Sequence, residues 1–374
     1  MKQQPSLANV PNALAATGLS NVGFAVFWYN LGDFNGFLPS VVWLICLHAI
    51  LGLLMQGTFV ARALWYARET ARDLLAHPAN ITTIGAISIA MALMGKLLNS
   101  FDDMGLPAVS IKFSTSVVIV ATVLSLASIC VFIPLCIHTK TYPEPFFCVV
   151  IYSILFMVVS FPGDNHLVEV TKVVVFGIGL ALCPAIFIMI PRAVFPRHRE
   201  EDVVANNPSV CVMQAGPGIL CTAWLTNPLT SESDSGAGAV ISHFLFGLST
   251  LSFLSVLVCL YQRRLILSTI GVHPQWAPLS FPFINSAIAA GVYRSLFPSP
   301  FITVWCFLLT GIAIVNHTTV NIMYLSRLFF IYDDYGLHVD VSFLLAGDEN
   351  QVSSTGNRTP RSEHQHSEQE LPVI

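Results

Sequence analysis

Apolar stretches long enough to cross a bilayer recur along the chain, separated by short polar segments. A hydrocarbon core of about 30 Å requires about 20 apolar residues in a helix, and every backbone amide and carbonyl inside it must be bonded within that segment. The pattern therefore predicts an all-α integral membrane protein with ten transmembrane helices, over residues 8–30, 39–62, 79–99, 108–137, 145–161, 168–190, 208–229, 238–262, 275–295 and 300–330.

The polar segments alternate in charge. Every second segment is a short acidic turn, as at Asp33 and Asp164, whereas those between them are longer and basic, such as "ARALWYARETARDLLAHP". If both termini are cytoplasmic, only four of the 17 Lys and Arg lie on the outer side, namely Lys96, Lys112, Lys172 and Arg294. Because Lys and Arg accumulate in cytoplasmic loops, the distribution favours five hairpins with both termini inside.

Composition supports the same class. Apolar residues make up 54% of the 374 residues, and charged residues make up 10%, against about 25% in soluble domains. The net charge is −4 without a basic block, so we expect a lipid bilayer as partner and no nucleic acid. The nine cysteines are scattered without a C-x-x-C pair, so we expect neither a metal nor a cofactor.

The domain organisation follows from the same patterns. We expect a short cytoplasmic N-terminus at residues 1–7, a ten-helix transmembrane domain at 8–330, and a cytoplasmic, partly disordered polar tail at 331–374. The start of the chain has no short apolar region that ends in a cleavage site, so the first apolar stretch is expected to stay as a helix.

The odd-numbered and even-numbered spans differ in side-chain size. Odd spans carry Gly, Ala, Ser, Thr, Asn and Pro, as in "WAPLSFPFINSAIAAGVY", although the fifth is bulkier, and even spans are richer in Leu, Val, Phe and Trp. Small residues in a membrane helix mark close packing or a wet surface, and any single such helix is explained by ordinary packing. Their alternation predicts an inner ring of odd helices around an axial path, inside an outer ring of even helices.

Three motifs resemble one family of transport proteins. "AATGLS" at 15–20, "NPSVCVMQAGPGI" at 207–219 and "WAPLSFPF" at 276–283 are together similar to the tellurite-resistance/dicarboxylate transporter family. That family includes malate and sulfite transporters and the slow anion channels of plant guard cells. The resemblance implies five hairpins in a pseudo-fivefold ring around a central pore, subunits that assemble as homotrimers, and a phenylalanine in the ninth helix that plugs the pore.

The resemblance assigns individual residues as well. The plug is Phe281, which lies in the ninth span between Ser280 and Pro282. Gly218 stands where the family's G-P-P stretch has its second proline, and Pro278 is an additional proline. Asn285 follows Phe281 by four residues and shares its helix face, where it either donates to an anion or bonds a neighbouring helix. The pore-lining candidates are Thr17, Gly18, Gly216, Pro217, Gly218, Ser280, Pro282 and Asn285.

The chemistry of the ionisable residues favours anions. The spans lack paired carboxylates, which argues against a cation pump. Lys96 and Arg294 lie near the outer ends of the third and ninth spans, where they either attract anions or extend to the lipid interface. His48, His243 and His317 lie on even spans, and we expect them to be hydrogen-bonded packing residues.

These observations indicate passage of anions across the plasma membrane, with C4-dicarboxylates such as malate, sulfite and small inorganic anions as candidate substrates. A gated channel and a proton-coupled carrier both fit the pattern. A membrane enzyme or a scaffold is disfavoured, because the chain contains neither H-E-x-x-H nor G-x-S-x-G.

The predicted orientation can be tested at a glycosylation sequence. Asn80-Ile81-Thr82 matches the acceptor pattern but falls at an inner helix end. We expect Asn80 to carry no glycan when the chain is expressed in a eukaryotic cell, as measured by unchanged gel mobility after glycosidase treatment. A glycan on Asn80 would reverse the orientation.

Overall fold

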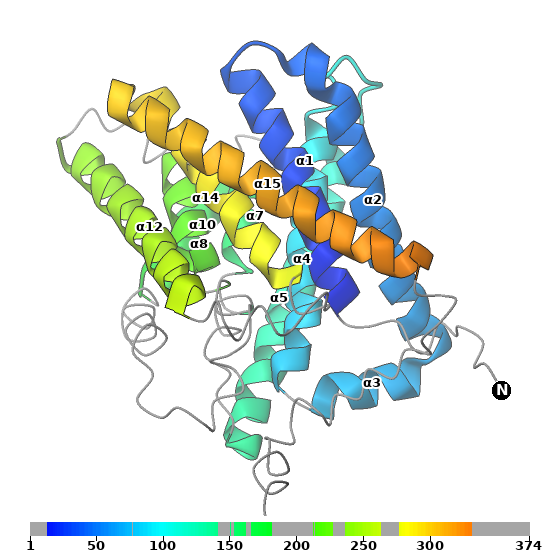
Figure 1. The fold of residues 1–374 in the computed structure, drawn as a ribbon. Coiled ribbons are helices and arrows are strands. Elements are labelled where there is room, and N and C mark those ends of the chain that lie inside the picture. Colours follow the sequence, from blue (N-terminus) through cyan, green and yellow to red (C-terminus); the bar gives the residue numbers. More distant parts are fainter. Residues whose placement is uncertain are drawn as a thin grey trace, which may run out of the picture. The chain divides into compact units, whose positions relative to one another are not determined.

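The computed structural model describes residues 13–76, 78–140, 150, 153–161, 166–181, 212, 214–226, 236–262 and 277–330. All of them belong to the first of two compact units, Met1–His338, and every regular element among them is a helix (Figure 1). The second unit is Val339–Ile374. The predicted terminal segments, 1–7 and 331–374, lie outside the described residues.

Each predicted span corresponds to a helix. The helices are α1 Ala13–Phe34, α2 Leu38–Trp65, α4 Pro78–Asn99, α5 Ile111–Thr139, α7 Leu155–Ser160, α8 His166–Ala181, α10 Ala215–Leu225, α12 Gly236–Gln262, α14 Ala277–Leu296 and α15 Pro300–Phe330. Five of these helices are long and apolar enough to cross a membrane, namely α2, α4, α5, α12 and α15. The protein is therefore an all-α membrane protein, as the pattern predicts.

The helices pack as five hairpins. Each odd span lies against the even span that follows it, in the pairs α1–α2, α4–α5, α7–α8, α10–α12 and α14–α15. Each even span also contacts the next odd span, through α2–α4, α5–α7, α8–α10, α12–α14 and α15–α1. Figure 1 shows the last of these, where α15 crosses both α14 and α1. The same contact pattern thus repeats five times around the domain.

The odd spans themselves close a ring. Helix α1 packs on α4, α4 on α7, α7 on α10, α10 on α14, and α14 returns to α1. In α4, 67% of the most apolar window is buried, against 28% in α2, α5 and α15. The predicted inner ring of odd helices and outer ring of even helices is therefore confirmed.

The outer helices carry large apolar side chains on their exposed faces. An uncovered apolar surface of this extent is typical of contact with lipid, since hydrocarbon chains are as apolar as leucine. Examples with more than half of the side chain exposed are Trp43, Leu54, Val123, Ile137, Phe244, Leu251, Phe301 and Val304.

Glycines bring the two helices of a hairpin close together. A Cβ atom on Gly52 of α2 would lie 2.9 Å from the carbonyl oxygen of Gly18 and 2.5 Å from Val22 Cγ2. A Cβ atom on Gly18 would meet Gln56 at 3.0 Å and the carbonyl oxygen of Gly52 at 3.1 Å. Gly18 therefore faces the outer helix α2 and allows close packing within the first hairpin.

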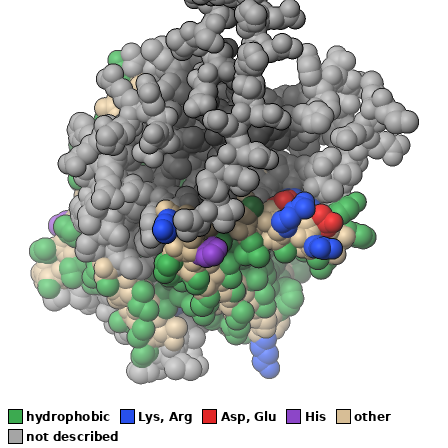
Figure 2. Space-filling model, turned by 90° about the horizontal axis from the view of Figure 1, so that it is seen from below, with side chains coloured by type: hydrophobic (Ala, Val, Ile, Leu, Met, Phe, Trp, Pro, Cys, Tyr) green, Lys and Arg blue, Asp and Glu red, His purple; other side chains and the backbone are tan. Residues whose placement is uncertain are grey.

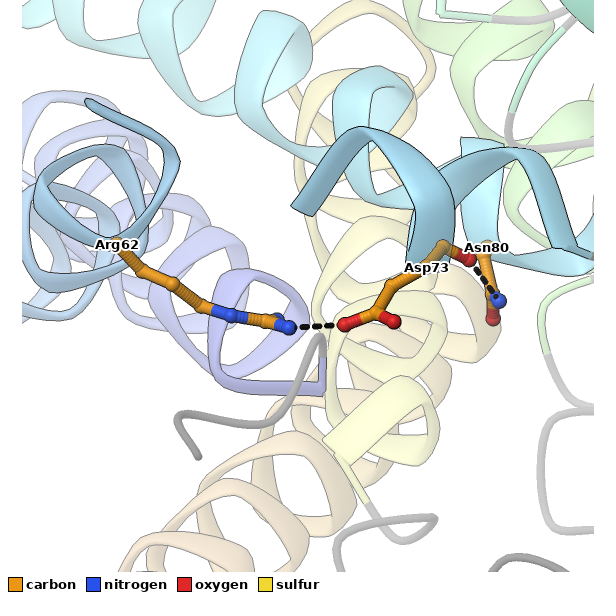
Figure 3. Close-up of polar contacts among 3 residues, drawn as sticks. All are labelled: Arg62, Asp73 and Asn80. Carbon is orange, nitrogen blue, oxygen red and sulfur yellow. Dashed lines mark hydrogen bonds and ion pairs between the residues drawn. The ribbon is translucent and has the colours of Figure 1, made fainter. Parts of the chain in front are cut away.

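The loop between the first two hairpins contains a helix that the spans do not predict, α3, Ala67–Ala76. Figure 3 shows how it is tied down: buried Arg62 at the end of α2 pairs with Asp73, and Asn80 Nδ2 donates to the Asp73 carbonyl oxygen at 2.6 Å. Arg68, Glu69 and Arg72 of α3 remain exposed. Figure 2 shows one cluster of basic and acidic side chains on this face, with single basic side chains elsewhere.

The close approach at Gly52 predicts a difference between two substitutions in α2. We expect Gly52→Ala to lower the free energy of unfolding by about 1–3 kcal/mol, because the new methyl group meets backbone atoms of α1. Gly57→Ala is the matched control, since a Cβ there meets nothing within 4 Å, and alanine favours the helix. Thermal unfolding in detergent measures both, and equal midpoints would contradict the close contact.

Candidate functional site

Phe281 lies in the interior of the ring. Its side chain is 7% exposed, and its ring centroid is 5.6 Å from that of Phe156 on α7. On the other side it lies against α1, where a Cβ on Gly23 would come within 2.9 Å of Phe281 Cε2. Helix α7 is not a ring neighbour of α14, so the side chain reaches across the interior. The Phe281 ring therefore fills space between α14, α7 and α1.

The helix around Phe281 is interrupted but well buried. Pro282 is the sixth residue of α14, and it has no amide proton to bond the carbonyl oxygen of Pro278. The side chains of Ser280, Phe281, Phe283 and Ile284 are all at least nine-tenths buried, although they point in different directions around the helix. This turn of α14 is therefore enclosed by other helices on every side.

A polar cluster joins α10 to α14. Asn285 Nδ2 donates to the Ala215 carbonyl oxygen at 2.9 Å, and Gln214 Nε2 donates to Ser286 Oγ. Gly218 leaves room for the amide, because a Cβ there would lie 2.6 Å from Asn285 Nδ2. Of the two roles that the sequence leaves open for Asn285, the structure has the bond to a neighbouring helix.

A family comparison accounts for this architecture. The model of the SLAC1 family, described as voltage-dependent anion channels, matches residues 9–325, a range that reaches from the first span into the tenth. The chain belongs to this family. The resemblance drawn from the three motifs is thereby confirmed at family level, and the protein is a multi-pass membrane protein that transports anions. A search of curated proteins finds no match to the chain.

The other pore-lining candidates of this SLAC1-family chain occupy varied positions. Thr17 is fully buried in α1, and its carbonyl oxygen accepts a bond from Asn21 Nδ2 at 3.0 Å. Ser280 Oγ lies 2.8 Å from His317 Nδ1, so this hydroxyl group faces the outer helix α15. Gly216 and Pro217 are buried in the first turn of α10, where the missing proline amide would have no intrahelical partner.

The two candidate anion-attracting residues lie at helix ends. Arg294, in the last turn of α14, donates to Asn35 Oδ1 at 2.5 Å, and its guanidinium carbon is 5.6 Å from the Phe307 ring centroid. Lys96, in the last turn of α4, is half-buried and within the electrostatic reach of Asp33 and Lys172. Both residues therefore lie in the last turn of an inner helix.

A small cavity lies between α1, α14 and α15. Its volume is about 20 Å³, and its lining includes Phe27, Asn30, Arg294 and Thr310. A cavity of this size holds about one water molecule, and Asn30 Nδ2 beside it is buried without a hydrogen-bond partner among the described residues. In this described part of the chain, no group of three or more His, Cys, Asp or Glu residues is suited to hold a metal ion.

Sequence reasoning missed Gln214 and Ser286, which bond each other between α10 and α14. Gln214 lies in the motif of the seventh span, four residues before Gly218. Residues four apart share a helix face, so a polar side chain next to a glycine could have indicated a close polar contact with another helix. His48, His243 and His317 all have hydrogen-bond partners, as predicted.

The bond of Asn285 predicts a structural role for this side chain. We expect Asn285→Ala to lower the free energy of unfolding by about 1 kcal/mol, because the Ala215 carbonyl oxygen loses a buried donor. Anion selectivity should stay unchanged. Thermal unfolding and the reversal potentials of an anion series measure the two effects. Altered selectivity at normal stability would indicate that Asn285 contacts the passing anion.

Proposed function

We propose that this protein is an anion channel of the plasma membrane, with a conduit inside the ring of α1, α4, α7, α10 and α14 that Phe281 closes. One observation carries the proposal: the Phe281 ring extends from α14 to α7, across the ring interior, while it rests on Gly23 of α1. An aromatic side chain at a narrow neck blocks ions both by its size and by excluding water.

The charges of the inner helices favour an anion over a cation. Asp33 is the one acidic residue in their described segments, and it is exposed at the end of α1. Lys96 and Arg294 lie at the ends of α4 and α14. Between these ends the buried polar groups are neutral, so an anion is attracted at the mouth and is not trapped inside.

The finer properties follow from the family resemblance and the charge pattern. We propose that both termini are cytoplasmic and that three subunits assemble as a homotrimer, each with its own conduit. C4-dicarboxylates such as malate, sulfite and small inorganic anions are the candidate substrates. The alternative is a proton-coupled carrier on the same fold, in which substrate uptake collapses with the proton gradient.

Removal of the Phe281 ring tests the proposal. We expect Phe281→Ala to raise anion flux in liposomes about tenfold or more, equivalent to a barrier lowered by about 1.4 kcal/mol. The reversal potential should follow the anion gradient alone, which distinguishes a channel from the carrier.

The matched control is Phe253→Ala. Phe253 on the outer helix α12 is equally buried and packs on Phe283 of α14 with ring centroids 5.4 Å apart, outside the ring interior. Its flux should remain at the wild-type level. Unchanged flux in a folded Phe281→Ala protein, with a normal elution profile and melting midpoint, would end the gate assignment.

A further inference from the structure

Four hydrogen bonds form a continuous, partly buried chain that ends beside Phe281. His48 Nδ1 lies 3.1 Å from Asn21 Oδ1, and Asn21 Nδ2 lies 2.9 Å from Asn321 Oδ1. Asn321 Nδ2 lies 2.8 Å from His317 Nε2, and His317 Nδ1 lies 2.8 Å from Ser280 Oγ. The chain joins α2, α1, α15 and α14, and Asn21, Ser280 and His317 are at most 1% exposed.

The direction of every bond in the chain is determined by backbone carbonyls. Asn21 Nδ2 also reaches the Thr17 carbonyl oxygen at 3.0 Å, and Asn321 Nδ2 reaches the His317 carbonyl oxygen at 3.1 Å. A carbonyl oxygen only accepts, so the amide nitrogens must occupy these positions. Asn321 therefore donates to His317 Nε2, which carries no proton, and His317 Nδ1 donates to Ser280 Oγ. His48 Nδ1 likewise donates to Asn21 Oδ1.

This arrangement requires a neutral His317. A second proton would place an N–H on Nε2 facing the N–H of Asn321, so two donors would oppose each other and the bond would be lost. The groups that face the His317 ring are Phe24 on α1, with centroids 4.0 Å apart, His48 on α2, with centroids 5.2 Å apart, Ser280 and Asn321. His48 is the titratable member of this set, and none of its members is a carboxylate that would stabilise a cation.

The chain holds the turn that carries Phe281. Helix α14 lacks one backbone hydrogen bond at Pro282, so this turn depends on contacts from other helices. Two come from α15: the bond between His317 and Ser280, and Asn316 Nδ2, which donates to the Leu279 carbonyl oxygen at 3.3 Å.

We propose that His317 is a positioning residue that, as a neutral imidazole, holds the Phe281 turn of α14 against α15, and that a proton on His317 releases this turn. The inference rests on the proposed gate and adds a mechanism by which protonation regulates it. Loss of the hydrogen bond between His317 and Ser280 does not remove the Phe281 ring. It loosens the backbone that orients this ring, so the conduit opens more often.

The first test measures anion flux through the full-length protein in liposomes. We expect Ser280→Ala and His317→Asn to raise flux about threefold to tenfold, the change in the open population that corresponds to the free energy of one buried hydrogen bond. In the Phe281→Ala background neither substitution should add a further increase, because the residue that they position is already absent. His243→Ala is the control, since His243 bonds Tyr293 at the far end of α14 at 2.5 Å.

The second test measures the same flux as the pH falls from about 7 to about 4, a range that extends below that of free imidazoles because the buried ring lacks a carboxylate partner. Wild-type flux should rise as a proton disrupts the chain, whereas Ser280→Ala and His317→Asn should show a flat, raised profile. A purely structural role for these residues would raise flux without removing the pH response. Where His317→Asn does not fold, Ser280→Ala carries both tests.

The outcomes separate the two proposals. If Phe281→Ala raises flux but Ser280→Ala and His317→Asn match the wild type at every pH, the positioning role is wrong and the gate stands. If Phe281→Ala has no effect, the gate itself is wrong. Additive flux increases in the double variants would also overturn the positioning role, because His317 would then act independently of Phe281. Co-transport of a proton with each anion would overturn it as well, because His317 would then carry the transported proton.

Discussion

Close approach of helix backbones is the constraint on which the rest of this structure depends. Between lipid-facing helices there is no hydrophobic driving force, so association relies on packing at short range. Gly18 and Gly52 allow this in the first hairpin, and Gly95 allows it in the second, where a Cβ would meet Val118 at 2.5 Å. Hairpins that are closed in this way can present their small-residue helices to one another, and five of them complete the ring. Gly23 applies the same principle in the interior, where the missing side chain makes room for the Phe281 ring.

Several polar groups in the inner helices hold helices together. Asn285 bonds α10, Ser280 bonds α15, and Asn21 links α1 to both α2 and α15. Each bond removes a donor from any passing anion, and each satisfies a group that would be costly to bury alone. A conduit with few free polar groups would attract anions only weakly, which is consistent with the proposed channel. In that proposal an apolar side chain controls the passage, together with the residues that position it.

The elements follow directly from the hydrophobic pattern, because a membrane helix must satisfy its own backbone within one continuous segment. The predicted span 39–62 is α2 at Leu38–Trp65, and 300–330 coincides with α15. Helix α3 was missed because a ten-residue amphipathic helix in a charged loop lacks the length of a span. Its position depends on the Arg62–Asp73 ion pair, which joins residues of two elements and has no local signature.

The sequence by itself determined that ten apolar segments form helices, that they alternate in bulk, and that the chain belongs with anion transport proteins through its motifs. These properties are local, since length, side-chain size and motif residues are written along the chain. Only the tertiary structure decided which way each side chain turns. Gly18, Ser280 and Asn285 lie on inner helices, yet they face neighbouring helices, whereas Phe281 faces the interior. The rotation of a helix about its axis is set by all of its packing partners together, and those partners lie tens to hundreds of residues away in the chain.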